Sequence, residues 1–353
     1  WSNAYFAQSV LGSEVKSGDP IISILPMAHM YGMAFEFIFE FLTGCHIYFL
    51  TRIPSPAIIA QAFSEIKPRV IISVPLVIEK IIRKRVFPKL QNNAIRLLMH
   101  MPVIAKKLGD KICQQVSDAF GGQFYEVIIG GAAFNQEVEK FLHRIGFKYT
   151  VGYGATECAP IICYADYHTY VPGSCGRPVV NMQVEIDSPD PERIPGEILA
   201  KGMNVMLGYY KNEEATRQAL DAEGWYHTGD LGTMDAQGNV FIKGRSKNML
   251  LGASGQNIYP EEIEDKLNSM ELVSECIVIQ EGDKLVGLVY PDYDEAQNLG
   301  LSNSDIEKVM EQNRAELNQS QPAYCRLSSI RLRSEEFEKT PKKSIKRYLY
   351  QKA

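Results

Sequence analysis

The chain has 353 residues, of which 45% are hydrophobic and 22% charged. This length allows two domains, and the composition is that of a soluble globular protein rather than a disordered or fibrous one. The net charge of −5 gives no electrostatic reason to expect a nucleic-acid partner. The seven cysteines include no C-x-x-C pair, so they indicate reduced thiols in a cytoplasmic protein, not a disulfide framework or a zinc site.

The most apolar run of the chain is "MAFEFIFEFLTGCHIYFL" at residues 33–50. Glu36 and Glu40 interrupt this run, whereas a span through lipid needs about 20 nearly uncharged residues. We therefore predict a core helix that runs into a strand. Contact with a membrane surface, and so peripheral membrane association, is the lesser alternative.

The rest of the first half alternates strand-like apolar runs with helical periodicity. The segments "RVIISVP" at 69–75 and "YEVIIGG" at 125–131 are typical of buried strands that end in turn residues. After the second strand, Asn135 is placed to cap a helix that Gly146 closes. The apolar stripe of this helix consists of Val138, Phe141, Leu142 and Ile145. Strand, glycine turn and helix in this order predict an α/β domain with parallel strands.

From about residue 173 the pattern changes to short alternating strands, which predict a small antiparallel or barrel-like module. A segment with its own helices and strands follows Arg245, so we place a domain boundary near Lys247. The expected strands of the module are 182–187, 196–202 and 239–245, and the later elements are a helix at 260–268, strands at 274–280 and 284–292, and a polar helix from about Ser304.

The loop "VGYGATECAP" at 151–160 combines glycines, an aromatic ring, a hydroxyl and a carboxylate. Tyr153 can stack on a ring, Thr156 can contact a phosphate, and Glu157 can offer oxygen ligands to Mg²⁺. Glu157 stands where a dinucleotide fingerprint needs its third glycine, so that motif is excluded. Taken alone, such a short pattern is more often a tight surface turn.

Two later motifs can each be interpreted as functional or as structural, and one histidine is a further candidate. Asp230 in "GWYHTGDLG" can accept hydrogen bonds from sugar hydroxyls or can simply cap a turn. The segment 244–264 holds Arg245, Lys247 and a Gly-Ala-Ser-Gly loop, and it is equally a linker followed by a helix. Of the six histidines, only His29 in "LPMAHMYG" gains interest from its neighbours.

The joint order of these segments is more specific than any one of them. In sequence, "LPMAHMYG", "IIGGAAF", "GYGATE", "PGSCGRP", "GWYHTGDLG", "GRSKNMLLGASGQNIYPEEIE" and "TPKKSIKR" resemble the successive core motifs of the adenylate-forming superfamily of acyl-CoA synthetases. The segments "KPRVIISVPLVIEKII" and "GQNIYPEEIEDKLN" resemble the bacterial long-chain fatty-acid CoA ligases most closely.

This resemblance implies two domains. Residues 1–246 would be the C-terminal part of the large AMP-binding domain, α/β to about 172 and a β module at about 173–246, and residues 247–353 a small mobile α+β lid domain. The family's Ser/Thr/Gly-rich phosphate loop and an initiator methionine are both missing here. We therefore expect the chain to be the C-terminal part of a longer ligase and to be inactive alone.

The resemblance also implies ATP, Mg²⁺ and coenzyme A as cofactor and substrates, and it assigns roles. The catalytic candidates are His29, Thr156, Glu157, which would hold Mg²⁺, and Lys343. The nucleotide-binding candidates are Gly131, Ala132, Tyr153, Gly154, Thr156, Asp230, Ile242 and Arg245. The hinge and CoA candidates are Lys247, Gly252 and Gly255.

The tail "KTPKKSIKR" departs from the family pattern at one position. The catalytic lysine is expected three residues after Pro341, where this chain has Ser344. A neutral hydroxyl cannot supply the charge-assisted contact of an ammonium. Lys343, one residue earlier, is the candidate substitute. The alternative is that adenylation is impaired.

The function that the resemblance implies is ATP-dependent activation of a long-chain fatty acid as acyl-AMP, followed by transfer to CoA. Fatty acid, ATP and CoA would be the partners. The alternatives are transfer to an acyl carrier protein, a medium-chain or aryl acid as substrate, or a non-catalytic module that binds nucleotide or acyl groups. Acyl chain length and oligomeric state stay open from sequence.

Overall fold

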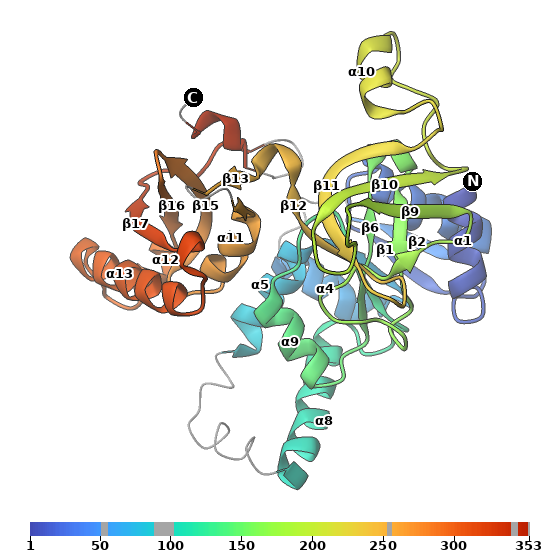
Figure 1. Cartoon of the computed structure of the whole chain (residues 1–353). Helices are drawn as coiled ribbons and strands as arrows, with labels where there is room; N and C mark the ends of the chain where they lie inside the picture. Colours follow the sequence, from blue (N-terminus) through green and yellow to red (C-terminus); the bar gives the residue numbers. More distant parts are fainter. Residues whose placement is uncertain (51–55, 88–101, 253–255, 340–344, 352–353) are drawn as a thin grey trace. The chain divides into compact units, whose positions relative to one another are not determined.

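The computed structural model describes residues 1–50, 56–87, 102–252, 256–339 and 345–351 (Figure 1). The chain divides into two compact units, each with its own apolar core. The first unit comprises residues 1–228 and 232–242, and the second comprises 229–231 and 243–353.

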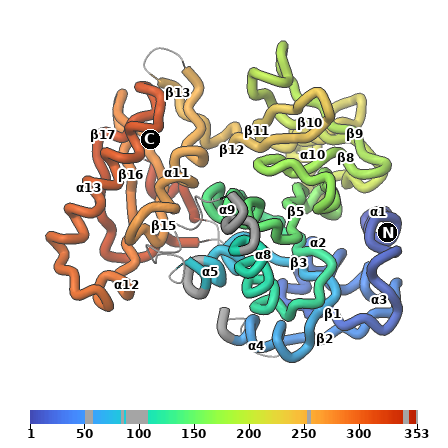
Figure 2. The backbone as a smooth tube through the Cα atoms, turned by 90° about the horizontal axis from the view of Figure 1, so that it is seen from below, coloured from blue at the N-terminus to red at the C-terminus, as the bar shows by residue number. Residues whose placement is uncertain are grey.

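A parallel sheet lies at the centre of the first unit, with strand order β3-β4-β5. Its residues are almost all buried, because helices contribute to the core around it. A second parallel pair joins β1 to β2, and α4 packs on β1 (Figure 2). These elements are α1 (Ser2–Leu11), β1 (Pro20–Ser23), β2 (His46–Phe49), α4 (Pro56–Ile66), β3 (Ile71–Ser73), α5 (Pro75–Arg85), α8 (Pro102–Ala119), β4 (Val127–Ile129), α9 (Gln136–Arg144) and β5 (Tyr149–Val151). The predicted α/β class is confirmed.

The helix predicted after β4 is α9, and its start follows the expected capping. The side chain of Asn135 accepts a hydrogen bond from the main-chain nitrogen of Val138 at 3.2 Å. Val138 and Leu142 of the predicted apolar stripe are fully buried. The helix ends before Gly146, whose φ of +71° suits glycine.

The apolar run at 33–50 is a core helix that runs into a strand, as predicted. It directly follows α2 (Met30–Gly32) and consists of a π-helical turn η1 (Met33–Ile38), α3 (Phe39–Thr43) and then β2. Among the residues that the structure describes, none forms a helix long and apolar enough to cross a membrane.

The two glutamates of this helix are fully buried. The Glu36 carboxylate accepts hydrogen bonds from the Ser23 hydroxyl at 3.1 Å and from the main-chain nitrogen of Leu25 at 2.9 Å. Within the described part of the chain, neither carboxylate oxygen of Glu40 has a hydrogen-bond partner of good geometry, although the Cys45 thiol lies beside it. Burial raises the pKa of Glu36 to about 7 and that of Glu40 to about 8. Glu40 is therefore held largely protonated near neutral pH, whereas the raised pKa of Glu36 lies close to neutrality.

We predict that Glu40→Gln makes the stability of the protein less dependent on pH. The folded-state pKa of Glu40 is raised from 4.5 to about 8, so the folded protein binds a proton that the unfolded chain releases. That contribution is complete below about pH 4.5 and is lost as the pH rises through about 8. The loss is on the order of 3 kcal/mol, which the glutamine variant avoids. Urea unfolding at about pH 5 and about pH 8.5 measures it. The exposed Glu65→Gln is the control, and equal pH dependence of all three proteins would contradict the prediction.

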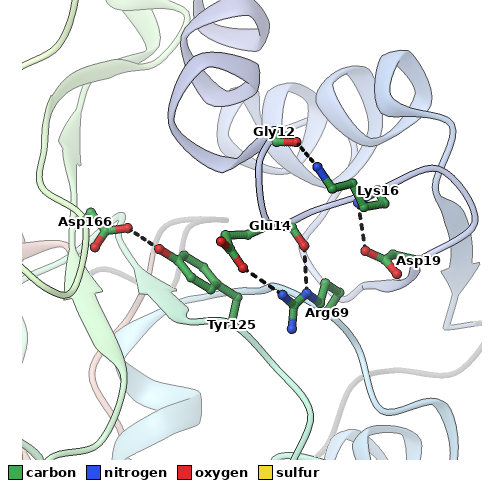
Figure 3. A network of polar contacts seen from close by, with 7 residues as sticks. All are labelled: Gly12, Glu14, Lys16, Asp19, Arg69, Tyr125 and Asp166. Atoms are coloured by element: carbon green, nitrogen blue, oxygen red, sulfur yellow. Dashed lines mark hydrogen bonds and ion pairs between the residues drawn. The ribbon is translucent and has the colours of Figure 1, made fainter.

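Figure 3 shows polar contacts of the residues in front of two sheet strands, and one of these residues is joined to the segment after α1. The guanidinium of Arg69, two residues before β3, donates to the carbonyl oxygen of Glu14 at 2.8 Å and to its carboxylate at 2.9 Å. Tyr125, two residues before β4, donates its hydroxyl to Asp166 at 2.7 Å. These contacts therefore lie at the amino ends of the parallel strands and leave their carboxyl ends for other contacts.

The antiparallel strands between residues 153 and 245 form open sheets and belong to the first unit except at residues 229–231 and 243–245. One has the order β6-β7-β8 and the other β12-β11-β10-β9, and the helix α10 lies apart from both (Figure 1). Of the two forms predicted for this module, the antiparallel one is correct, and the described strands close no barrel. The elements are β6 (Tyr153–Gly154), η2 (Thr156–Cys158), β7 (Ile161–Tyr164), β8 (Arg177–Pro178), β9 (Met182–Asp187), β10 (Gly196–Gly202), α10 (Glu213–Ala219), β11 (Tyr226–Met234) and β12 (Val240–Arg245).

The second unit is α+β. Its sheet pairs β15 antiparallel with β16 and β16 parallel with β17, and α11 and α13 share one core with it. A smaller apolar cluster that includes Phe337 and Ile345 contacts other residues of β15 and β16. The elements are η3 (Ser246–Asn248), β13 (Leu250–Leu251), β14 (Asn257–Ile258), α11 (Pro260–Asn268), β15 (Val273–Glu281), β16 (Lys284–Pro291), α12 (Tyr293–Asn298), α13 (Asn303–Gln319), η4 (Ala323–Cys325), β17 (Leu327–Leu332) and η5 (Arg347–Leu349). All seven cysteines of the chain are free thiols, as predicted.

Candidate active site

The carboxyl ends of the three parallel strands are aligned by main-chain hydrogen bonds. The nitrogen of Gly130 donates to the carbonyl of Ser73 at 3.1 Å, and the nitrogen of Gly152 donates to the carbonyl of Ile129 at 2.9 Å. Beyond this edge the main chain turns at Gly131, whose φ is +88°, and Gly131 and Ala132 are exposed. The two candidates from "IIGGAAF" therefore lie at the edge where open α/β sheets bind ligands.

The second candidate loop begins directly after β5, at the same edge. Gly154 is exposed, and a Cβ on it would lie 2.3 Å from the carbonyl oxygen of Pro160, so only glycine fits. The side chain of Tyr153 belongs to the apolar core of the first unit and is 7% exposed. Little of this side chain is open to a ligand in this structure. The stacking of Tyr153 on a ring therefore stays a prediction.

Glu157 lies in the turn η2, next to the exposed Thr156. The hydroxyl of Tyr209 donates to Oε1 of Glu157 at 2.8 Å, and burial together with the nearby Glu157 charge raises the pKa of the Tyr226 hydroxyl. Partial burial and the bond to Glu157 raise the pKa of Tyr209 to about 12. The main-chain nitrogen of Met206 donates to the Glu157 carbonyl at 2.7 Å. Sequence reasoning missed both tyrosines, since neither is near the loop 151–160 in the chain.

Two buried asparagines hold this turn from segments distant in sequence. Nδ2 of Asn204 donates to the carbonyl of Cys158 at 2.7 Å and to that of Ile161 at 2.8 Å. Nδ2 of Asn3, on α1, donates to the Cys158 carbonyl at 3.1 Å. The position of Glu157 thus depends on side chains about 50 and 150 residues away in the chain.

We predict that Asn204→Ala destabilises the first unit by about 2 kcal/mol, because it removes a donor to the Ile161 carbonyl and a donor to the Cys158 carbonyl, which keeps Asn3. The change should also loosen the turn at 156–158. Urea unfolding measures the stability, and hydrogen exchange at residues 155–162 measures the loosening. The exposed Asn298→Ala serves as the control. Unchanged exchange in a destabilised variant would show that Asn204 does not hold this turn.

The donor set around Glu157 fits one particular kind of metal binding. Among the described residues there is no group of three or more His, Cys, Asp or Glu side chains that could hold an ion. Mg²⁺ is commonly bound by one or two carboxylates together with substrate phosphates and water. One half-buried carboxylate beside an exposed threonine hydroxyl fits Mg²⁺ held mainly by a nucleotide, and does not fit an all-protein metal centre.

Four of the described candidates belong to the second unit: Asp230, Arg245, Lys247 and Gly252. Asp230 is 7% exposed, and its Oδ1 lies 2.7 Å from Nε of Arg245, whose side chain is exposed. The sequence did not predict this ion pair. Lys247 is exposed in η3, and the nitrogen of Gly252 donates to the Gln256 carbonyl at 2.8 Å.

The remaining candidates are scattered. Ile242 is exposed on β12 of the first unit. His29 is partly exposed and directly precedes α2. Two residues later, the hydroxyl of Tyr31 donates to the carbonyl of Ile128 on β4 at 3.1 Å, which ties the segment of His29 to the central sheet. Gly255 and Lys343, like Ser344, lie outside the described residues.

The tail motif is anchored on both sides of residues 340–344. Arg347 and Glu264, both nearly buried, form an ion pair at 2.5 Å, and Arg347 also donates to the Val278 carbonyl at 3.0 Å. On the other side, Lys339 pairs with Glu275 and forms an antiparallel bridge with Ile345. The described residues of the tail, Lys339 and 345–347, are thus part of the folded second unit.

Two family models match the chain. The model "AMP-binding enzyme" matches residues 1–210 and the model "AMP-binding enzyme C-terminal domain" matches residues 247–353. Long-chain-fatty-acid CoA ligase 1 of Saccharomyces cerevisiae is 28% identical over 330 residues, covering 84% of this chain and 47% of the yeast protein. A long-chain-fatty-acid acyl-carrier-protein ligase of Arabidopsis thaliana, AEE15, is 31% identical over 225 residues, covering 59% of this chain and 30% of that protein. The chain therefore spans about half or less of the length of these relatives.

Solved structures share the fold. The o-succinylbenzoate CoA synthetase of Bacillus subtilis in complex with AMP superposes with a TM-score of 0.74 at 18% identity, over 100% of this chain and 65% of that one. The same enzyme with ATP and a magnesium ion gives 0.71 at 19% identity, over 99% and 65%. Because the first family model covers more than half of the chain, the chain belongs to the AMP-binding enzyme family, the adenylate-forming enzymes, and within it stands near the long-chain fatty-acid CoA ligases.

Proposed function

We propose that the complete protein is an ATP-dependent ligase that activates a long-chain fatty acid as acyl-AMP and transfers the acyl group to coenzyme A. The observation that carries this proposal is the carboxyl edge of the β3-β4-β5 sheet. Exposed main chain at Gly131 and Ala132 lies there beside the strand that leads to Thr156 and Glu157. Adenylation needs a nucleotide site of this kind, where cations neutralise the phosphoryl charge.

In this proposal each group has one task in the first half-reaction. Glu157 holds Mg²⁺, which neutralises charge on the nucleotide phosphates, and the Thr156 hydroxyl contacts phosphate. The main chain of Gly131 and Ala132, with Tyr153 and Gly154, lines the adenine site. Asp230 accepts hydrogen bonds from the ribose hydroxyls. Its ion pair with Arg245 supports this role, because it fixes the carboxylate and brings a cation next to it.

The second half-reaction requires the lid domain, which we assign to residues 247–353. In the proposal this domain turns about Lys247 and exchanges Lys343 for the loop 252–255 at the active site. Such a motion separates two half-reactions within one pocket. His29 takes a place between the acyl and thiol channels, and the anchoring of Arg347 on Glu264 supports a tail that moves with the domain.

The names of the relatives differ in the acid and in the acceptor. The yeast relative supports a long-chain acid and CoA. The Arabidopsis relative acts on a carrier protein, and the B. subtilis enzyme takes an aryl acid, so these are the alternatives to be tested.

We predict that the protein expressed from the complete reading frame exchanges pyrophosphate into ATP in a fatty-acid-dependent manner. The rate should be highest with long-chain acids, and the product with CoA should be a thioester. Acids from short to long chain, an aryl acid, and CoA against a carrier protein form the test series. Exchange without a CoA thioester would favour the carrier-protein alternative, and no exchange with any acid would refute the enzyme. Residues 1–353 alone should show little exchange.

We predict that Lys343→Ala slows adenylation by about 100-fold, because it removes the cation expected at the carboxylate and the α-phosphate. Thioester formation from supplied acyl-AMP should change little. Lys346→Ala is the matched control, since its ammonium is paired with Glu338 at 3.2 Å. Equal small effects on the two half-reactions would remove Lys343 from the mechanism and leave impaired adenylation as the alternative.

A further inference from the structure

The segment between β10 and α10 contacts Glu157 twice. The Met206 nitrogen donates to the main-chain carbonyl of Glu157 at 2.7 Å, and the Tyr209 hydroxyl donates to its Oε1 at 2.8 Å. One short segment therefore fixes both the backbone and the side chain of this residue. Such a double contact restricts the direction in which the carboxylate points.

Tyr209 is itself held in place by α10. Its main-chain nitrogen donates to the hydroxyl of Thr216 at 2.9 Å, and this hydroxyl donates to the Asn212 carbonyl at 2.8 Å. The preceding residue, Gly208, packs so closely that a Cβ on it would lie 2.8 Å from Cγ2 of Thr216. The base of the Tyr209 side chain is therefore fixed independently of its contact with Glu157.

The Tyr209 side chain is nevertheless accessible. It is 37% exposed and borders an open cavity of about 410 Å³, lined also by Leu207, Glu213 and Arg217. Tyr226, a second phenol whose pKa the Glu157 charge raises, is only 5% exposed. Tyr209 thus contacts the carboxylate from the open side, and it can lose its hydroxyl without opening the core.

A carboxylate has about four lone-pair sites, so the hydrogen bond from Tyr209 leaves room for a cation. Partners that orient a ligating carboxylate are worth roughly 10-fold to 100-fold in metal affinity. We propose that Tyr209 is a positioning residue that aims the Glu157 carboxylate at the metal of a metal–nucleotide complex. This inference rests on the proposed metal role of Glu157 and adds a residue that no motif of the sequence marks.

The test is the binding of Mn²⁺ to the complete protein saturated with a non-hydrolysable α,β-methylene analogue of ATP, followed by electron paramagnetic resonance. Tyr209→Phe should weaken Mn²⁺ binding about 10-fold or more. Binding of the analogue without a divalent cation, and the thermal midpoint, should stay unchanged. Tyr210→Phe is the matched control, because this neighbouring tyrosine is 88% exposed and faces Lys211. Thr216→Val, which removes the hydroxyl that holds the Tyr209 main chain, should give a smaller effect in the same direction.

The variant Glu157→Gln distinguishes a failure of the Tyr209 positioning role from a failure of the metal role of Glu157. If Glu157→Gln weakens Mn²⁺ binding and Tyr209→Phe binds like wild type, the role of Tyr209 is refuted and the metal role of Glu157 stands. If Glu157→Gln itself binds Mn²⁺ like wild type, the metal role of Glu157 fails, and the inference fails with it. Equal weakening in the Tyr209 and Tyr210 variants would also refute a specific positioning role.

Discussion

The candidate site depends on the alignment of parallel strand ends. Parallel strands finish at one edge, and here two main-chain hydrogen bonds, from Gly130 to Ser73 and from Gly152 to Ile129, extend the alignment one residue past the strands. Two loops that are about 20 residues apart in the chain are thereby brought to one edge. The ties through Arg69 and Tyr125 at the opposite ends of the strands leave this edge free (Figure 3).

In the first unit, tyrosine hydroxyls repeatedly hydrogen-bond to glutamate side chains. The hydroxyl of Tyr164 donates to Glu126, and that of Tyr170 donates to Glu139 at 2.5 Å; all four residues are buried. Burial raises the pKa of Glu126 to about 8, so there the pairing satisfies a core carboxyl. Glu157 has the same kind of partner but is only half buried. The same interaction is thus structural in the core and becomes available for ligand binding at the edge.

In the second unit, the described residues that flank 340–344 are held by an ion pair and by packed rings. Arg347 is desolvated against Glu264, and a buried ion pair of this kind is costly to break even where it adds little net stability. The ring of Tyr350 packs edge-on against Phe337, and Arg333 lies over both rings. These contacts fix the residues on either side of 340–344 to the sheet. Composition alone could not distinguish this arrangement from a solvated basic tail.

The sequence by itself determined the periodic elements. Capping at Asn135, the alternation at 182–187 and 196–202, and the helix at 260–268 depend on neighbours within a few residues, and all were found where predicted. The order of the motifs determined the family for the same reason, because each motif is local. The tertiary structure alone decided the partners of Glu157, the pairing of Asp230 with Arg245, and the burial of Glu36 and Glu40. The paired residues are far apart in the chain, and only folding brings them within hydrogen-bonding distance. Folding likewise removes Glu36 and Glu40 from water, and no local sequence pattern predicts either outcome.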